Sequence, residues 1–309
     1  MTSVGSPFVW GVFALVVTAA LAVDLGLFHR EARIVRMREA AAWTAVWSVL
    51  ALLFNAFVFY KFGMGKALEF TQGWLLELAL SVDNVFVFLI IFRYFKVAPE
   101  HQHRVLFWGI IGAVVTRGVF IALGVAVIAR FHWVMYILGA FLVYTAIKIV
   151  VQKDDELDPS HNPALKLFHR LVPMSPSYDG SRFTTRVDGR LLATPLLAVL
   201  VVVESVDVMF AVDSIPAVLG VTTDIFIVLT SNVFAILGLR SLFFLVEGLI
   251  RKLRFLKLGV SVILAFIGVK ILIEGFYKIP VAVSLGVLAS VLIVTSLASV
   301  LFPLRESRE

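Results

Sequence analysis

Cysteine is absent from this sequence of 309 residues, which excludes disulfides, thiolate metal sites and thiol redox chemistry within the chain itself. Charge is also scarce: 16% of the residues are charged and 61% are hydrophobic, whereas a soluble domain has about 25% charged residues. The mean hydropathy is +0.99. The opening residues, MTSVGSP, lack a basic region, so we expect no cleaved secretory signal. These features predict a protein embedded in a membrane.

Nine apolar runs are long enough to cross a bilayer, for which a helix needs about 20 residues. They lie at 8–28, 40–60, 72–92, 105–129, 133–151, 194–214, 225–249, 258–277 and 281–302. The sequence therefore predicts an all-α, polytopic membrane protein with about nine transmembrane helices. We expect a single transmembrane domain over 1–309.

Basic residues outside the apolar runs are distributed unevenly. The N-terminus and the connections after the second, fourth, sixth and eighth runs hold only Lys61, Lys66, Arg130 and Lys278. The other connections and the C-terminus hold the rest. Because cytoplasmic loops are enriched in Lys and Arg, this asymmetry predicts an outer N-terminus and an inner C-terminus.

One connection is long, at 152–193, and falls on the predicted inner side. Asn162 can cap a short amphipathic helix that has Pro163 at its first position. The stretch RFTTRVDGRLLAT predicts a small hairpin with Asp188-Gly189 as its turn. A plain connector is favoured here over a contact with a cytoplasmic protein, which stays the alternative.

Two acidic motifs, ELALSVDN at 77–84 and DVMFAVDS at 207–214, form a weak internal repeat. The alignment pairs polar positions, namely Glu77 with Asp207, Asp83 with Asp213, Asn84 with Ser214, Arg117 with Arg240 and Lys148 with Lys270. The first motif is predicted to run from outside to inside, and the second runs the opposite way. We therefore predict inverted repeats over 72–151 and 194–277, an arrangement typical of secondary transporters with sites near the bilayer midplane.

Acidic residues lie within or near the expected bilayer core at Asp24, Glu77, Asp83, Glu204, Asp207 and Asp213. A charged side chain at the centre of a membrane helix costs roughly 2.5–3.5 kcal/mol, so such acids are rare without a role. One interpretation is structural pairing with Arg117, Arg240 and Lys270. Because the acids outnumber these bases, we expect some acids to carry a mobile cation or a proton.

Helical geometry groups these side chains. On a continuous helix Glu77 and Asn84 share one face, and Asp207 and Ser214 share another, whereas Asp213 points off its face. No histidine falls in the middle of an apolar run. Carboxylate, amide and hydroxyl oxygens are the ligands that remain, and they suit Mg²⁺, Ca²⁺ or Mn²⁺ better than Cu⁺ or Zn²⁺.

Several longer motifs resemble the TerC family, and most closely its Alx-like subgroup. They are DLGLFHR (24–30), ELALSVDNVFVF (77–88), HQHRVLFWGI (101–110), VESVDVMFAVDSIPAVLGVTTD (203–224) and SNVFAILGLRSLFF (231–244). The resemblance covers about 20–302. It implies a multi-pass protein of the bacterial inner membrane, related to the LysE exporter superfamily and linked to tellurite resistance, Mn²⁺ export and metal supply to secreted proteins.

Carried onto this chain, the resemblance implies a set of metal-path residues, namely Asp83, Asn84, Asp207, Asp213 and Ser214, with Glu77 beside them. Supporting or charge-pairing positions are Arg117, Arg240, Lys270, Glu204 and Asp24.

We therefore predict a transporter that exports a divalent cation, foremost Mn²⁺, with proton coupling as an option. The cation is the substrate, and no permanently bound cofactor, catalytic residue or nucleic-acid partner is expected. One rival hypothesis is a proton-coupled carrier of another substrate. A second is a non-transporting membrane scaffold that acts through 152–193 in stress resistance or metalation of secreted proteins.

Overall fold

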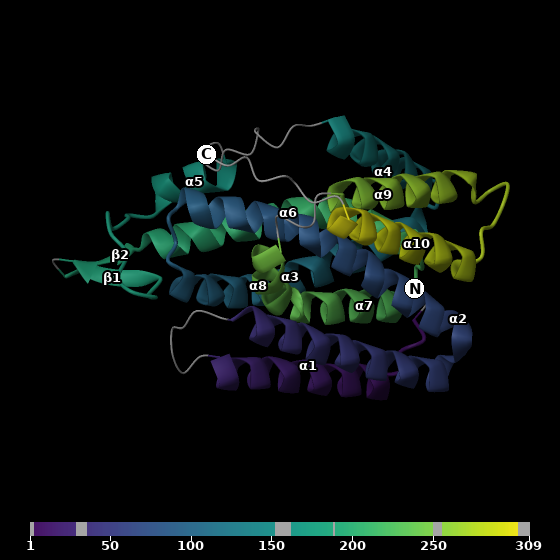
Figure 1. The fold of residues 1–309 in the computed structure, drawn as a ribbon, viewed down its shortest axis with the longest axis horizontal. Coiled ribbons are helices and arrows are strands. Elements are labelled where there is room, and N and C mark those ends of the chain that lie inside the picture. The colour runs from purple at the N-terminus through teal and green to yellow at the C-terminus, as the bar shows by residue number, and fades with distance from the viewer. Residues whose placement is uncertain (1–2, 29–35, 152–161, 188, 250–254, 302–309) are drawn as a thin grey trace.

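The computed structural model describes residues 3–28, 36–151, 162–187, 189–249 and 255–301. Within these ranges the chain is mostly helical and contains one two-stranded hairpin (Figure 1). In chain order the elements are α1 (Pro7–Phe28), α2 (Met37–Tyr94), α3 (Pro99–Arg130), α4 (Val134–Val151), α5 (Pro163–Leu171), β1 (Thr184–Val187), β2 (Arg190–Ala193), α6 (Pro195–Leu219), α7 (Ile225–Leu237), α8 (Leu239–Leu249), α9 (Leu256–Ile273) and α10 (Val281–Leu301).

The apolar runs of the sequence all coincide with helices. Of the described helices, five are long and apolar enough to cross a membrane, or six if α7 and α8 form one bent span. The helix α2 counts once in this number although it contains two predicted spans, and the apolar parts of α1 and α9 are shorter. A mostly helical chain with several helices that could cross a membrane is thus confirmed, whereas the count of nine and the orientation stay predictions.

The long helix α2 folds back on itself at Gly63. This residue has φ +84° and ψ +175°, a conformation that glycine adopts without steric cost. Asn55 and Thr71, which lie equally far from Gly63 on either side, meet with 2.7 Å between Nδ2 and Oγ1. A straight helix would separate these two residues by about 24 Å. The two arms of α2, 37–62 and 64–94, therefore run antiparallel and correspond to the second and third predicted spans.

The seventh apolar run is a broken helix rather than the continuous one that the sequence predicts. The helices α7 and α8 meet at Gly238 and are bent by 47°. The backbone N–H of Gly238 bonds to the carbonyl of Ile236 and so closes α7. Polar side chains on α7 thereby belong to a short helix that ends inside the bundle.

Most of the long helices lie roughly along the long axis of the molecule, whereas the short helix α8 runs across it (Figure 1). The helices α4, α9 and α10 form one side, α1 and the first arm of α2 form the opposite side, and α6 lies between them. The helices α4 and α9 pack so closely that a Cβ on Gly268 would lie only 2.7 Å from the carbonyl oxygen of Gly139. Small residues allow such close backbone approach in membrane helices.

The connection before α6 is folded as the sequence predicts. The side chain of Asn162 caps α5 by accepting hydrogen bonds from the backbone N–H groups of Ala164 and Leu165. Strands β1 and β2 pair antiparallel up to Val187 opposite Arg190, with Gly189 at φ +76°. Asp188, the other predicted turn residue, lies outside the described residues.

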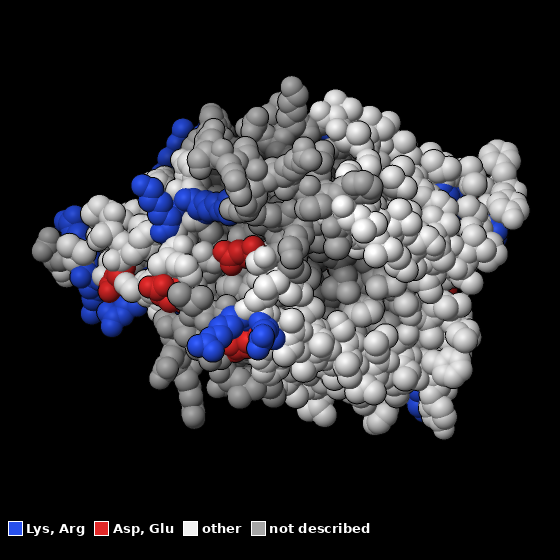
Figure 2. Space-filling view, viewed as in Figure 1, with Lys and Arg blue, Asp and Glu red and all other residues white. Residues whose placement is uncertain are grey.

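This connection is attached to the helical bundle. The hydroxyl of Tyr178 donates to the carbonyl oxygen of Phe95 at the end of α2, with 2.7 Å between the oxygens, and burial raises the pKa of this phenol. Arg104 of α3 donates to Ser181 and lies 5.0 Å from the ring centre of Phe183. Figure 2 shows Lys and Arg side chains gathered at the end of the molecule that carries β1 and β2.

Candidate functional site

A buried arginine of α3 contacts polar side chains from α2 and α6. Arg117 of α3 is 1% exposed and is the largest of the fully buried side chains among the described residues. Its guanidinium holds Asp207 with two nitrogens: Nη2 lies 3.0 Å from Oδ1, and Nε lies 3.5 Å from Oδ2. Nη1 donates to a carboxylate oxygen of Glu77 and to the hydroxyl oxygen of Ser214, the latter at 3.2 Å. Bidentate arginine–carboxylate pairs of this kind are stronger than neutral hydrogen bonds, because both partners are charged.

The charged residues of this cluster lie near the middle of their helical segments. Asp207 is the middle residue of α6, and Ser214 follows it by two turns on the same face, as the sequence predicts. Glu77 lies on the second arm of α2 and is 0% exposed, and Asp207 is 3% exposed. Glu77 and Asp207, the paired acids of the predicted repeat, therefore meet on a single guanidinium.

Asn232 of α7 belongs to the same cluster and was missed by the sequence analysis. Its Nδ2 donates to Glu77 Oε2 at 2.9 Å, and the residue is 1% exposed. Its Oδ1 has no hydrogen-bond partner among the described residues. The available signal was the polar triplet Thr230, Ser231 and Asn232 inside an otherwise apolar run. We call Glu77, Arg117, Asp207, Ser214 and Asn232 the Arg117 centre.

A close helix contact brings Asn232 to this position. A Cβ on Gly73 would lie 2.8 Å from the hydroxyl oxygen of Ser231, so only glycine lets the second arm of α2 approach α7 this closely. The hydroxyl of Ser231 itself donates to the carbonyl oxygen of Val228, at 3.1 Å. The next residue of α7 is then within reach of Glu77, one turn further along α2.

Other predicted metal-path residues lie apart from the Arg117 centre. Asp213 accepts a hydrogen bond from Thr145 of α4, with 3.3 Å between the oxygens, and so points off the shared face as predicted. Asn84 is 3% exposed on α2, and no contact joins it to the centre among the described residues. The side chains of Asp83 and Asp24 lie outside the described part of the structure.

The predicted supporting residues are distributed over the bundle. The carboxylate of Glu204 lies against Gly112 of α3, where a Cβ would overlap it. Arg240 is 4% exposed and lines a small cavity together with Asp207. Lys270 of α9 is half-buried and interacts electrostatically with Glu69 and Glu274, away from the centre.

The composition of the Arg117 centre leaves a charge imbalance. Two carboxylates share one guanidinium, so the centre carries a net negative charge when both acids are ionised. Among the described residues no three or more His, Asp or Glu side chains are grouped closely enough to hold a metal ion by themselves. The cation that the two acids hold in this arrangement is the guanidinium of Arg117.

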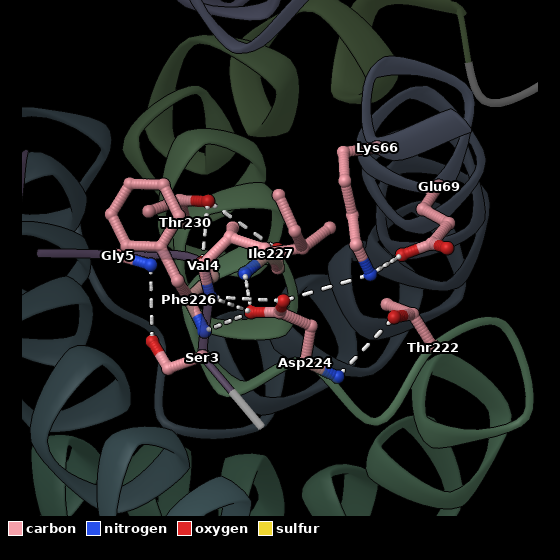
Figure 3. Close-up of polar contacts among 10 residues, drawn as sticks. All are labelled: Ser3, Val4, Gly5, Lys66, Glu69, Thr222, Asp224, Phe226, Ile227 and Thr230. Atoms are coloured by element: carbon pink, nitrogen blue, oxygen red, sulfur yellow. Dashed lines mark hydrogen bonds and ion pairs between the residues drawn. The ribbon is translucent and has the colours of Figure 1, made fainter. Parts of the chain in front are cut away.

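A second buried acid, Asp224, lies at the opposite end of α7 and has quite different partners (Figure 3). Asp224 is the N-cap residue of α7, and its Oδ1 accepts from the N–H groups of Phe226 and Ile227. Its Oδ2 accepts from the N–H of Val4 at 3.1 Å and lies 3.6 Å from Lys66 Nζ. We call Asp224, Val4, Lys66 and Glu69 the Asp224 cluster, since Lys66 also pairs with Glu69 at 2.8 Å.

Comparisons with known proteins agree along almost the whole chain. The sequence profile described as "Integral membrane protein TerC family" matches residues 62–307. A membrane protein of Myxococcus xanthus is 49% identical over 299 residues, which cover 97% of this chain and 94% of that protein. The "Putative membrane-bound redox modulator Alx" of Escherichia coli K12 is 47% identical over 304 residues, covering 96% and 95%.

A more distant membrane protein, from Rickettsia felis, is 37% identical over 292 residues, which cover 94% of this chain and 97% of that protein. No solved structure matches the chain.

Proposed function

The chain belongs to the TerC family of integral membrane proteins, and on this premise we propose that it exports a divalent cation, with Mn²⁺ as its foremost cargo. The observation that carries the proposal is the Arg117 centre. Two buried carboxylates from the paired positions of the predicted repeat, Glu77 and Asp207, hold one cationic side chain, that of Arg117, beside the middle of α6. Structural ion pairing would need only one acid for this arginine.

In the proposed cycle the guanidinium of Arg117 is a built-in counter-ion. A divalent cation that enters the centre takes over the two carboxylates, and its double charge balances theirs. Arg117 then moves away, and it returns when the cation leaves on the other side. Because the acids sit on α2 and α6 and the arginine on α3, this exchange couples occupancy of the site to the relative positions of three helices. Asp83 and Asp213, which the family resemblance implies as path residues, would act before or after this exchange.

The oxygen ligands support a hard or borderline ion. Carboxylates and the Ser214 hydroxyl are oxygen donors of the kind that Mg²⁺, Ca²⁺ and Mn²⁺ prefer. The name of the Alx relatives mentions a redox role, but this chain lacks cysteine and so offers no thiol for redox chemistry. An acidic site also repels an anion such as tellurite, so any tellurite resistance is proposed to be indirect.

The test is transport by the purified protein in liposomes, with Mn²⁺ followed by an entrapped dye. We expect wild-type flux and a loss of about tenfold or more in Glu77→Gln and Asp207→Asn, because each removes a charged ligand. Asp179→Asn is the matched control, since Asp179 pairs with Arg182 on the exposed connection outside the bundle. Asp83→Asn and Asp213→Asn, assayed in parallel, decide whether those acids belong to the path. Absence of Mn²⁺ flux in the wild type under every pH gradient would contradict the proposal.

One observation favours the scaffold as a second candidate function. The connection 162–193 is folded and attached to α2 and α3, with Arg182, Arg186 and Arg190 exposed. A plain connector needs neither the attachment nor the hairpin. Replacing residues 184–193 by a short flexible linker would largely spare Mn²⁺ flux in a carrier and would abolish the activity of a scaffold in cells.

A further inference from the structure

Asn232 combines two features that a structural amide does not need together. Its Nδ2 is committed to Glu77 Oε2 at 2.9 Å, whereas its Oδ1 has no hydrogen-bond partner among the described residues. The side chain is 1% exposed, so water does not reach this oxygen from the surface. Buried polar groups in native structures are nearly always paired, and an exception calls for an explanation.

The neighbouring hydroxyls on α7 do not supply the missing partner. Thr230 Oγ1 donates to the carbonyl oxygen of Phe226 at 2.7 Å, and Ser231 Oγ donates to that of Val228 at 3.1 Å. Both hydroxyls are thereby used within their own helix. The orphan oxygen of Asn232 is thus a feature of the Arg117 centre and not of α7 in general.

We propose that Asn232 is a ligand of the transported cation. When a divalent cation replaces the guanidinium of Arg117, Asn232 Oδ1 joins the carboxylates of Glu77 and Asp207 and the hydroxyl of Ser214 around it. The inference rests on the proposed function, because it assigns a further ligand to the same site. Its physical basis is that a cation beside Glu77 satisfies the acceptor of the Arg117 centre that has no donor among the described residues.

The chemistry of an amide suits this position. Two carboxylates already balance the charge of a divalent cation, so a neutral oxygen is sufficient as a further ligand. An amide oxygen adds a ligand without adding charge, and Ca²⁺, Mg²⁺ and Mn²⁺ accept such neutral oxygens. The same amide, through Nδ2, fixes the orientation of the Glu77 carboxylate.

The fold lets Asn232 adjust to an incoming ion. The residue lies on α7, a helix of 13 residues that ends at Gly238 with a bend of 47° before α8 begins. A short helix interrupted inside the bundle is the element from which transporters commonly build their ion sites. Ser214 and Asp207 lie on the longer helix α6, which continues from Pro195 to Leu219 although it contains Pro216.

The experiment measures Mn²⁺ affinity by calorimetry on the full-length protein in detergent, for wild type, Asn232→Leu and Asn232→Asp. Leucine keeps the size and removes both polar atoms. Aspartate keeps the oxygen and removes the N–H donor to Glu77. We expect Asn232→Leu to weaken Mn²⁺ binding by about tenfold or more, and Asn232→Asp to bind within a few-fold of wild type. Thr230→Val is the matched control on the same helix and is expected to bind like wild type.

Each other outcome overturns the inference in a recognisable way. If Asn232→Leu binds Mn²⁺ as tightly as wild type, Asn232 is no ligand, although the proposed function stands. If Leu and Asp variants weaken binding equally, the residue acts only by positioning Glu77. If the wild type binds neither Mn²⁺, Mg²⁺ nor Ca²⁺, the proposed function itself fails and the ligand role fails with it. Asn232→Ala is judged by the same criterion should Asn232→Leu not purify as a folded protein.

Discussion

The Arg117 centre and the Asp224 cluster both involve α7, both pair a buried acid with a base, and differ in how their polar atoms are satisfied. Asp224 accepts hydrogen bonds from three backbone N–H groups, two of them at the start of its own helix. Lys66 and Glu69 in the same cluster keep 28% and 18% of their side chains exposed. Solvent and backbone N–H groups thus satisfy most of the polar atoms of the Asp224 cluster.

The Arg117 centre has no such support. Its charged side chains, Glu77, Arg117 and Asp207, are 0–4% exposed, and their contacts are with other side chains. Both clusters hold two acids to one base, but in the Arg117 centre neither backbone N–H groups nor solvent offset the extra carboxylate in the contacts that the structure describes. Asn232 Oδ1 also has no partner among the described residues. Burying such groups is expensive, and a hydrophobic replacement of equal volume is often at least as stable.

This difference indicates that the Asp224 cluster has a structural role, whereas the Arg117 centre is the candidate functional site. The Asp224 cluster caps α7 and ties the residues before α1 to α7 and α2, and its carboxylates are satisfied by backbone N–H groups, by Lys66 and by solvent. In the Arg117 centre two buried carboxylates share one guanidinium, and Asn232 Oδ1 has no partner among the described residues. A buried and incompletely satisfied cluster beside the middle of α6 fits the proposed site, whose ligand comes and goes. Three variants, taken in order of expected effect, test this interpretation.

The largest effect is expected from Arg117→Gln, which leaves two buried carboxylates without their counter-charge. Breaking a buried pair from one side costs about 3–5 kcal/mol, so the thermal unfolding temperature in detergent should fall markedly. Added Mn²⁺ should then raise the unfolding temperature of Arg117→Gln more than that of wild type, because the ion no longer competes with the guanidinium. An equal Mn²⁺ response in both proteins would mean that the acids and the arginine form a structural pair only.

A smaller effect is expected at the other end of α7. Asp224→Ala removes the N-cap and the acceptor for Val4, and loss of a cap costs about 0.5–2 kcal/mol. Asp224→Asn keeps an oxygen acceptor and should lose less. Both variants should retain Mn²⁺ flux per folded molecule, and hydrogen exchange at the amide of Val4 should accelerate in Asp224→Ala. A loss of flux in a fully folded Asp224→Asn protein would place Asp224 in the ion path and erase the contrast between the clusters.

Much of the architecture could be predicted from the sequence, because apolar length alone marks membrane helices. The cap at Asn162 and the hairpin at Gly189 also follow from local residue chemistry. The break at Gly238 could not be predicted from the sequence, since an isolated glycine in an apolar run is compatible with a continuous helix. Its backbone is helical, at φ −77°, so no local strain marks the break and only the packing of α7 and α8 does.

The site was predictable in part, for a related reason. Charge in an apolar run is conspicuous, so Glu77, Asp207 and Arg117 stood out. Which acid pairs with which base is decided by how α2, α3 and α6 pack, and a single sequence does not contain that information. Asn232 was overlooked because an amide is uncharged and no spacing rule links it to Glu77, from which it is 155 positions distant.

The smallest effect is expected from Lys66→Gln, and its dependence on salt concentration distinguishes the Asp224 cluster from the Arg117 centre. Lys66 Nζ lies 3.6 Å from Asp224 and its side chain is 28% exposed, so Lys66→Gln should cost about 0.2–1 kcal/mol, as exposed ion pairs do. Ions screen such contacts, with a Debye length of about 3 Å at 1 M salt, so the difference in unfolding temperature between wild type and Lys66→Gln should vanish at that concentration. The deficit of Arg117→Gln should persist there, because monovalent salt screens a fully buried centre much less. A salt-sensitive Arg117→Gln deficit would show that water already reaches the centre, and Arg117 would then be a solvated gate residue instead of a buried counter-ion.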